Sequence, residues 1–206
     1  MKKLLSVLLC LTVLCGCGTE TSTETAEAET ETVTITNSVD LNVLSDPADM
    51  SGYVWLDDDD PAFTEISLQE SIKLFAMGGS GIVVYSADTC PFCNRAIPVL
   101  DSVLKEYGVK AYYVDTNTPI ASSSELSYEI YEELCSYISD IFELDENGDP
   151  MFQIPEVIAA KDGKIVGHHL SLVDSFTLVD SDTQLTDEEA QELADIYRNL
   201  IELAAD

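Results

Sequence analysis

Positive charge is the property that this sequence has least of. Its 206 residues include 9 Lys and Arg against 39 Asp and Glu, which gives a formal net charge of −30. Proteins bind nucleic acid by displacing its counterions with Lys and Arg, so nucleic acid is not expected as a partner. Anionic lipid headgroups would be repelled for the same reason. The charge favours partners that are basic or neutral.

Metal-ligating side chains are also scarce. The only two His are the neighbours His168 and His169, and the six Cys contain a single Cys-x-x-Cys pair, Cys90 and Cys93. A structural zinc site takes four such ligands, so half a zinc site is the weaker interpretation of the pair. The acidic run 57–60 lacks the glycine and the distal glutamate of a calcium loop and is predicted to be a solvated turn. We expect no metal and no cofactor.

Long apolar runs are missing except at the start of the chain. Residues 4–14 are apolar and follow two lysines, which is typical of an export signal and too short for a membrane-spanning anchor. The next residues, Cys15-Gly16-Cys17, resemble the cleavage site of a bacterial lipoprotein. We expect a signal peptide over residues 1–16, lipid attachment at Cys17 and a membrane-anchored protein. An ordinary secretory signal is the alternative.

The segment after this signal has little that could form a core. Residues 19–36 alternate Thr and Glu with scattered Ser and Ala, a composition typical of disordered chain. We therefore expect a disordered tether over residues 17–50. The remaining length, 51–206, suits one folded domain, which we expect to begin with a short strand at 52–56.

The Cys-x-x-Cys pair is the most informative motif present. It follows the apolar run 81–85, which predicts a strand that turns into a helix at the cysteines. Two intervening residues let one helical turn bring both sulfurs within bonding distance, and the amides at the helix start favour the thiolate of the first. We interpret Cys90 as a nucleophile and Cys93 as the thiol that resolves the mixed disulfide. Arg95 is the only cation near enough to tune them.

The periodicity of the remaining chain predicts alternating strands and helices. Leu126, Ile130, Leu134 and Ile138 recur every four residues and predict a helix within 116–152. The strands that flank the cysteine helix are expected to form a parallel pair through a right-handed crossover. The expected elements are helices at 67–77 and 90–107, a capped helix from Thr186, strands at 82–86 and 109–115, and a hairpin around Asp162-Gly163. The sequence predicts an α/β fold with a central mixed β-sheet flanked by helices.

Two stretches resemble the thioredoxin family. Residues 82–100, with Cys90-Pro91-Phe92-Cys93 and Pro98, are similar to the active-site strand and helix of thioredoxins. Residues 154–167, which begin Ile154-Pro155, are similar to the cis-proline loop and the hairpin after it. The resemblance covers about residues 66–204 and implies a thioredoxin fold with a helical insertion, about 116–152, before the cis-proline. It extends to thioredoxin-like proteins found around bacteriocin transport accessory proteins of Gram-positive bacteria.

This resemblance implies a function. The chain would be a monomeric, extracytoplasmic thiol–disulfide oxidoreductase on the cell membrane of a Gram-positive bacterium, acting on exported proteins or peptides that contain cysteines. Electrons would come from a membrane partner if it reduces them. Pro91, Phe92, Ile154 and Pro155 would bind the substrate peptide, with a cis bond before Pro155; a trans proline opening a strand is the alternative.

Two positions depart from the family. Thr89 stands where thioredoxins carry a tryptophan, and Val84 stands where they carry a buried acid that takes protons from the second cysteine. These departures leave the direction of electron transfer open. A non-catalytic accessory or chaperone domain for an export system and a metal-binding lipoprotein are the rival functions. Cys135 is interpreted as a small buried residue, with a regulatory thiol as the alternative.

Overall fold

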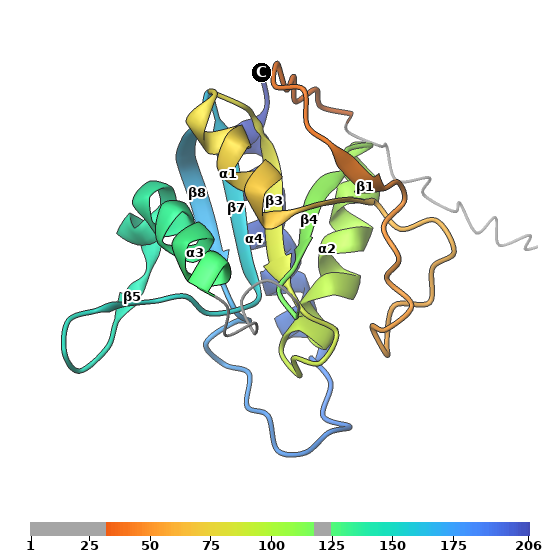
Figure 1. Cartoon of the computed structure of the whole chain (residues 1–206). Helices are drawn as coiled ribbons and strands as arrows, with labels where there is room; N and C mark the ends of the chain where they lie inside the picture. The colour runs from red at the N-terminus through yellow and green to blue at the C-terminus, as the bar shows by residue number, and fades with distance from the viewer. Residues whose placement is uncertain (1–31, 118–124) are drawn as a thin grey trace, which may run out of the picture.

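The computed structural model describes residues 32–117 and 125–206. The expected signal peptide, and Cys17 with it, lie outside these residues. In the described part, one mixed sheet of six strands has the order β1-β2-β4-β3-β7-β8 (Figure 1). Its strands are β1 (Val43–Ser45), β2 (Phe63–Ile66), β3 (Gly81–Ser86), β4 (Ala111–Asp115), β7 (Glu156–Lys161) and β8 (Lys164–Leu170).

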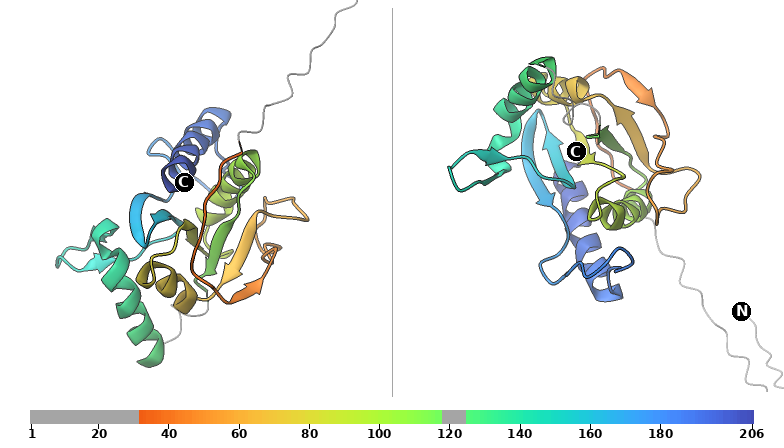
Figure 2. Two further views of the ribbon diagram at one scale, coloured as in Figure 1. Left: turned by 90° about the horizontal axis from the view of Figure 1, so that it is seen from above. Right: turned by 60° about the horizontal axis from the view of Figure 1, so that its bottom comes forward.

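Helices cover both faces of this sheet. They are α1 (Leu68–Ala76), α2 (Cys93–Tyr107), α3 (Glu125–Ile138) and α4 (Asp187–Ala204). Between α3 and β7 lie the 3-10 turn η1 (Ser139–Ile141) and a small hairpin of β5 (Glu143–Leu144) and β6 (Pro150–Met151). Helices α2 and α4 pack on one face, and α1 and α3 on the other (Figure 2). The α/β fold with a mixed central sheet is therefore as predicted.

The strand directions follow from the connections. Strands β2, β4 and β3 run parallel because helices connect them, and β7 and β8 form an antiparallel hairpin beside β3. Every residue of β3 is buried, as its unbroken apolar run requires of a central strand. With the cysteine pair at the start of α2 and a proline before β7, the structure has the thioredoxin-like arrangement that the resemblance implied.

Local signals set several element ends. The turn between β7 and β8 uses Asp162 and Gly163, whose φ angles of 52° and 72° suit a tight hairpin. Gly108, with φ 67°, ends α2. Thr186 and Glu189 form a reciprocal capping box at the start of α4. The predicted insertion helix is present as α3, which packs against α1.

The predicted tether is wrong for residues 32–50. This segment follows the edge of the domain, and its β1 pairs antiparallel with β2. Ala48 and Met50 are buried, and Val33 and Ile35 pack against the core beneath α2 and α4. Apolar residues spaced among Thr, Ser, Asn and Asp are enough for an edge segment, although they give no compositional signal of a core. The rest of the expected tether lies outside the described residues.

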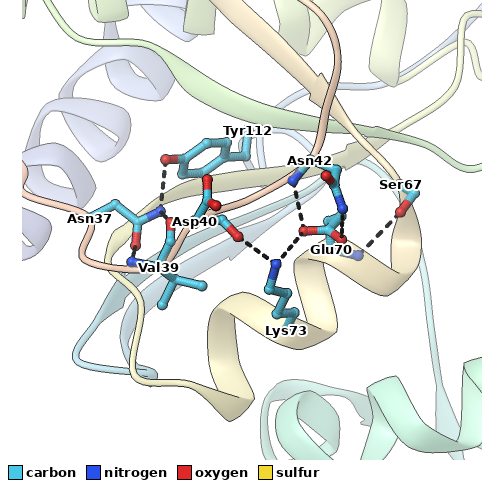
Figure 3. Close-up of polar contacts among 8 residues, drawn as sticks. All are labelled: Asn37, Val39, Asp40, Asn42, Ser67, Glu70, Lys73 and Tyr112. Carbon is cyan, nitrogen blue, oxygen red and sulfur yellow. Dashed lines mark hydrogen bonds and ion pairs between the residues drawn. The ribbon is translucent and has the colours of Figure 1, made fainter.

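Side-chain contacts hold this segment to α1 and β4 (Figure 3). Ser67 caps α1 by accepting from the Glu70 amide at 3.2 Å. The Glu70 carboxylate does not complete the capping box; it accepts from the backbone and side-chain amides of Asn42, each at 2.9 Å. Asn37 donates to the Tyr112 hydroxyl at 2.9 Å. The Glu70 carboxylate also pairs with Lys73 of α1 at 3.3 Å, so it links the N-terminal segment to the helix.

Two further expectations are corrected. Residues 52–56 form turns rather than a strand, with Tyr53 donating its backbone amide to Met50 and Leu56 to Tyr53. The cysteine helix begins at Cys93 rather than at Cys90. The Cys90 carbonyl still accepts from the Asn94 amide at 3.1 Å, so helical hydrogen bonding starts there. Among the described residues, no helix has the length and hydropathy needed to cross a bilayer.

Candidate active site

The two cysteines lie where β3 turns into α2. Cys93 is the first residue of the helix and is fully buried, whereas Cys90 precedes it in a turn and is half-buried. The Cys93 backbone amide donates to the Cys90 sulfur at 3.3 Å. Both are free thiols. The close Cys-x-x-Cys pair at a helix start is the geometry that the spacing predicts.

The surroundings of the pair make the two sulfurs unequal. The pKa of Cys90 is lowered to about 6, first by the hydrogen bond from the Cys93 thiol, then by backbone amides and by the Arg95 charge, against the opposing effect of burial. The pKa of Cys93 is raised, first by burial and then by its neighbour Cys90. At neutral pH Cys90 is therefore mainly a thiolate while Cys93 holds the shared proton.

Ile154 and Pro155 lie directly beside this pair. The bond between them is cis, which rules out the trans alternative in this structure. The Cys90 sulfur lies 3.7 Å from the Ile154 carbonyl oxygen, although 64 residues separate the two. Pro155 is buried and Ile154 is half-exposed. The half-exposed Ile154, just before β7, therefore lies next to the more accessible sulfur.

Pro91 and Phe92 form the other side of the turn. Pro91 is exposed, and Phe92 is half-buried with its ring edge-on to Phe176 at a centroid distance of 6.5 Å. Phe176 belongs to the long loop 171–186 between β8 and α4, which runs below the sheet in Figure 1. This loop therefore lies against the Cys-x-x-Cys turn.

Arg95 joins this loop to the helix. Its side chain is only 3% exposed, and its guanidinium donates to the carbonyls of Thr183 at 2.7 Å, of Ser181 at 2.8 Å and of Pro91. It also lies over the Trp55 ring, 4.3 Å from the centroid. Among the described residues, no carboxylate forms an ion pair with it. The Arg95 charge is therefore not neutralised by an ion pair and can stabilise the Cys90 thiolate. The nearness of Arg95 to Cys90 in the sequence did not predict its contacts with the loop and with Trp55.

A chain of hydroxyl groups beside Cys93 was not predicted. Hydrogen bonding by Ser86, the last residue of β3, stabilises the Cys93 thiolate and so opposes the rise in the pKa of Cys93. The Tyr53 hydroxyl shares a hydrogen bond with the Ser86 hydroxyl at 2.7 Å, and its oxygen lies 3.2 Å from the Tyr113 hydroxyl. Val84, at the position of the thioredoxin acid, is fully buried and supplies no polar group. A serine that closes an apolar strand was the one available sequence signal.

The third described cysteine lies elsewhere. Cys135 is half-buried on α3, on the sheet face opposite Cys93. Burial raises its pKa, against a hydrogen bond with Tyr131 that lowers it. A raised pKa keeps the thiol protonated, which fits a packed small residue better than a reactive one.

Metal ligands do not cluster in the described part of the chain. There, no group of three or more His, Cys, Asp and Glu is arranged to hold a metal ion. His168 Nδ1 lies 3.0 Å from the Glu156 carboxyl, but burial raises the pKa of Glu156 to about 8 and lowers that of His168. The two are therefore neutral hydrogen-bond partners rather than an ion pair.

Comparisons with known proteins add little to this geometry. No family model matches the chain, and no curated protein does. Among solved structures, it is similar to the crystal structure of thioredoxin from Aeropyrum pernix, with 23% identity, over 52% of this chain and 73% of that chain, at a TM-score of 0.34. So low a score carries no argument, and the fold assignment rests on the strand order and helix layers of this chain.

Proposed function

We propose that this protein is an extracytoplasmic thiol–disulfide oxidoreductase that acts through Cys90-Pro91-Phe92-Cys93. One observation carries the proposal: the Cys90 sulfur lies at the start of α2 with a pKa lowered to about 6, next to a buried Cys93 thiol with a raised pKa. Thiol–disulfide exchange needs this asymmetry, because the first sulfur must attack as a thiolate while the second keeps its proton until it is needed.

The reaction proceeds in two exchanges. The Cys90 thiolate attacks one sulfur of a substrate disulfide, which breaks that bond, forms a mixed disulfide and releases a substrate thiolate. Cys93 then loses its proton and attacks the Cys90 sulfur, which forms the Cys90–Cys93 disulfide and releases the second substrate thiolate. Two electrons pass to the substrate. The same steps in reverse oxidise a substrate dithiol, and no cofactor is required.

The substrate side is formed by backbone and apolar groups. The exposed Pro91, the ring of Phe92 and the backbone of Ile154 before Pro155 suit an extended peptide with a cysteine held over Cys90. A net charge of −30 favours basic or neutral peptides. We infer that the substrates are exported proteins or peptides. We also infer that the protein is a monomer anchored through lipidated Cys17 to the outer face of a Gram-positive cell membrane. If it is a reductase, a membrane partner would supply its electrons.

The reduction potential of the pair tests the proposal. The full chain is equilibrated in glutathione buffers, free thiols are alkylated, and the state of Cys90 and Cys93 is read by mass spectrometry. A potential near or above about −200 mV indicates an oxidase or isomerase, and one near or below about −270 mV a reductase.

A matched control and a contradicting outcome complete this test. The Cys135→Ser variant should give the same potential, since that thiol lies on the other face of the sheet. A pair that never exchanges with glutathione would refute the oxidoreductase and favour a non-catalytic accessory domain for an export system.

A further inference from the structure

In the second exchange, the proton that the Cys93 thiol loses has no evident acceptor. Cys93 is 0% exposed and its pKa is raised, so its proton cannot pass directly to bulk water. Val84, buried and apolar, offers no acceptor at the position where thioredoxins carry an acid. The thiol must nevertheless deprotonate before it can attack the mixed disulfide. The protein therefore needs another acceptor near Cys93.

Three buried hydroxyl groups form a continuous line from this thiol. Ser86 is close enough to Cys93 to lower the pKa of its thiol. The oxygens of Tyr53 and Ser86 are 2.7 Å apart, and those of Tyr53 and Tyr113 are 3.2 Å apart. Ser86, Tyr53 and Tyr113 are 0%, 3% and 5% exposed. Each hydroxyl can donate one hydrogen bond and accept two, so each can receive a proton on one side and release one on the other.

The line ends at a pocket of about 270 Å³ on the surface. Tyr53 and Tyr113 form part of its wall, and the rest is lined by Asp49, Gly52, Glu65, Asp88, Asp115 and Asn117. The Asp88 carboxylate accepts from the Asn117 side-chain amide at 2.8 Å and faces Gly52, where a side chain would collide with it. Water and carboxylates in such a pocket can take up or supply a proton.

We propose that Ser86, Tyr53 and Tyr113 form a relay that carries the Cys93 proton to this acidic pocket. The proposal rests on the proposed function. As Cys93 attacks Cys90, its proton moves to the Ser86 oxygen, the Ser86 proton to Tyr53, the Tyr53 proton to Tyr113, and the Tyr113 proton to water or a carboxylate in the pocket. In the oxidising direction the same line returns a proton to Cys93 as it leaves. No hydroxyl changes its net protonation in either direction.

The test isolates the second exchange. The full chain, with Cys10→Ser, Cys15→Ser, Cys17→Ser and Cys135→Ser as a common background, is reduced and mixed with dithiobis(nitrobenzoate) in a stopped-flow instrument. Attack by Cys90 releases one thionitrobenzoate, and attack by Cys93 on the mixed disulfide releases a second. The two phases report the two exchanges separately.

The relay predicts effects on the second phase only. Tyr53→Phe and Ser86→Ala should slow it by on the order of 100-fold, the lower end of what positioned proton transfer supplies. Ser86→Thr keeps the hydroxyl and should restore the rate. In the protein without these relay substitutions, deuterated water should also slow the second phase more than the first.

Two buried tyrosines provide matched controls. Tyr85 is the neighbour of Ser86, but its hydroxyl bonds Ser71 on the other face of the sheet at 3.0 Å. The buried Tyr197 hydroxyl has no hydrogen-bond partner among the described residues, so it has nowhere to pass a proton. Tyr85→Phe and Tyr197→Phe should leave both phases unchanged.

The outcomes separate this proposal from the proposed function. A common background that releases only one thionitrobenzoate refutes the proposed function, because Cys93 then does not resolve the mixed disulfide. Two releases, with an unchanged second phase in folded Tyr53→Phe and Ser86→Ala, overturn the relay alone. Failure of Ser86→Thr to restore the rate likewise overturns it, because packing rather than the hydroxyl would then be responsible.

Discussion

The two faces of β3 use buried polar groups in different ways. On the face covered by α2 and α4, Cys93 is linked through Ser86 and Tyr53 towards a surface pocket. On the face covered by α1 and α3, the Tyr85 hydroxyl ends on the Ser71 hydroxyl, which in turn donates to the Leu68 carbonyl. Similar hydroxyls are buried on both faces, and only one set leads to a titrating thiol. Burial and satisfied hydrogen bonds alone therefore do not distinguish a reactive face from a structural one.

Removing each thiol in turn should give the largest difference between the faces. Cys90→Ser should abolish disulfide exchange, because no thiolate remains at the start of α2. Cys93→Ser should instead accumulate the mixed disulfide, because attack still occurs and resolution does not. Cys135→Ser, on the other face, should retain full activity. Insulin reduction and intact-mass measurement check all three, and exchange activity in Cys90→Ser would contradict the assignment.

The thiols of the two faces should also differ in their dependence on pH. A thiolate forms as pH rises through the pKa, so alkylation of Cys90 by iodoacetamide should be half-maximal near pH 6 and level off at higher pH. Burial raises the pKa of Cys135, so its alkylation should still be increasing in alkaline solution. At pH 7 Cys90 should react roughly tenfold faster or more. Peptide mapping after timed alkylation measures both, and equal rates at pH 7 would contradict this contrast.

Arg95 connects the reactive face to loop 171–186. Arg95→Met removes three hydrogen bonds that a charged, 3% exposed side chain donates to carbonyls, so the free energy of unfolding should fall by about 3 kcal/mol. It also removes a positive charge near the Cys90 thiolate, so the pKa of Cys90 should rise. Urea unfolding and the absorbance of the thiolate against pH measure the two effects.

A surface arginine on the same side of the sheet is the control. Arg198 on α4 pairs with Glu106 and Asp195 in partly exposed ion pairs, which contribute at most about 1 kcal/mol. Arg198→Met should therefore leave the pKa of Cys90 unchanged and have the smaller effect on unfolding. If both variants unfold alike and neither changes that pKa, Arg95 has no special part in the site.

Local sequence signals predicted the reactive face better than its surroundings. The Cys-x-x-Cys spacing, the apolar β3 run and the Ile154-Pro155 pair are short motifs, and the structure brings Cys90 and Ile154 together as the resemblance implied. The helical insertion followed from a four-residue apolar repeat, which is likewise local. Each of these signals could be read within a window of about twenty residues.

The features that the sequence did not predict depend on contacts between distant segments. The position of β1 at the sheet edge depends on Asn42 meeting Glu70, and the hydroxyl line depends on Tyr53 meeting Ser86 from an irregular loop. Asn42, Tyr53 and Ser86 belong to no motif, and the Thr- and Glu-rich composition of residues 19–36 suggested disorder. Pairings of this kind are decided by tertiary packing, which outweighs local composition.

The smallest expected effect tests the face opposite the cysteines. Tyr85→Phe keeps the ring that lies edge-on to Phe152 and removes only the hydroxyl bonded to Ser71. Ser71 still donates to the Leu68 carbonyl, so no group is left without a partner and the free energy of unfolding should fall by about 1 kcal/mol. The rates of both exchanges should not change. If Cys93 resolved the mixed disulfide more slowly in this variant, losing a buried hydroxyl on either face of β3 would affect Cys93. The distinction between the two faces would then fail.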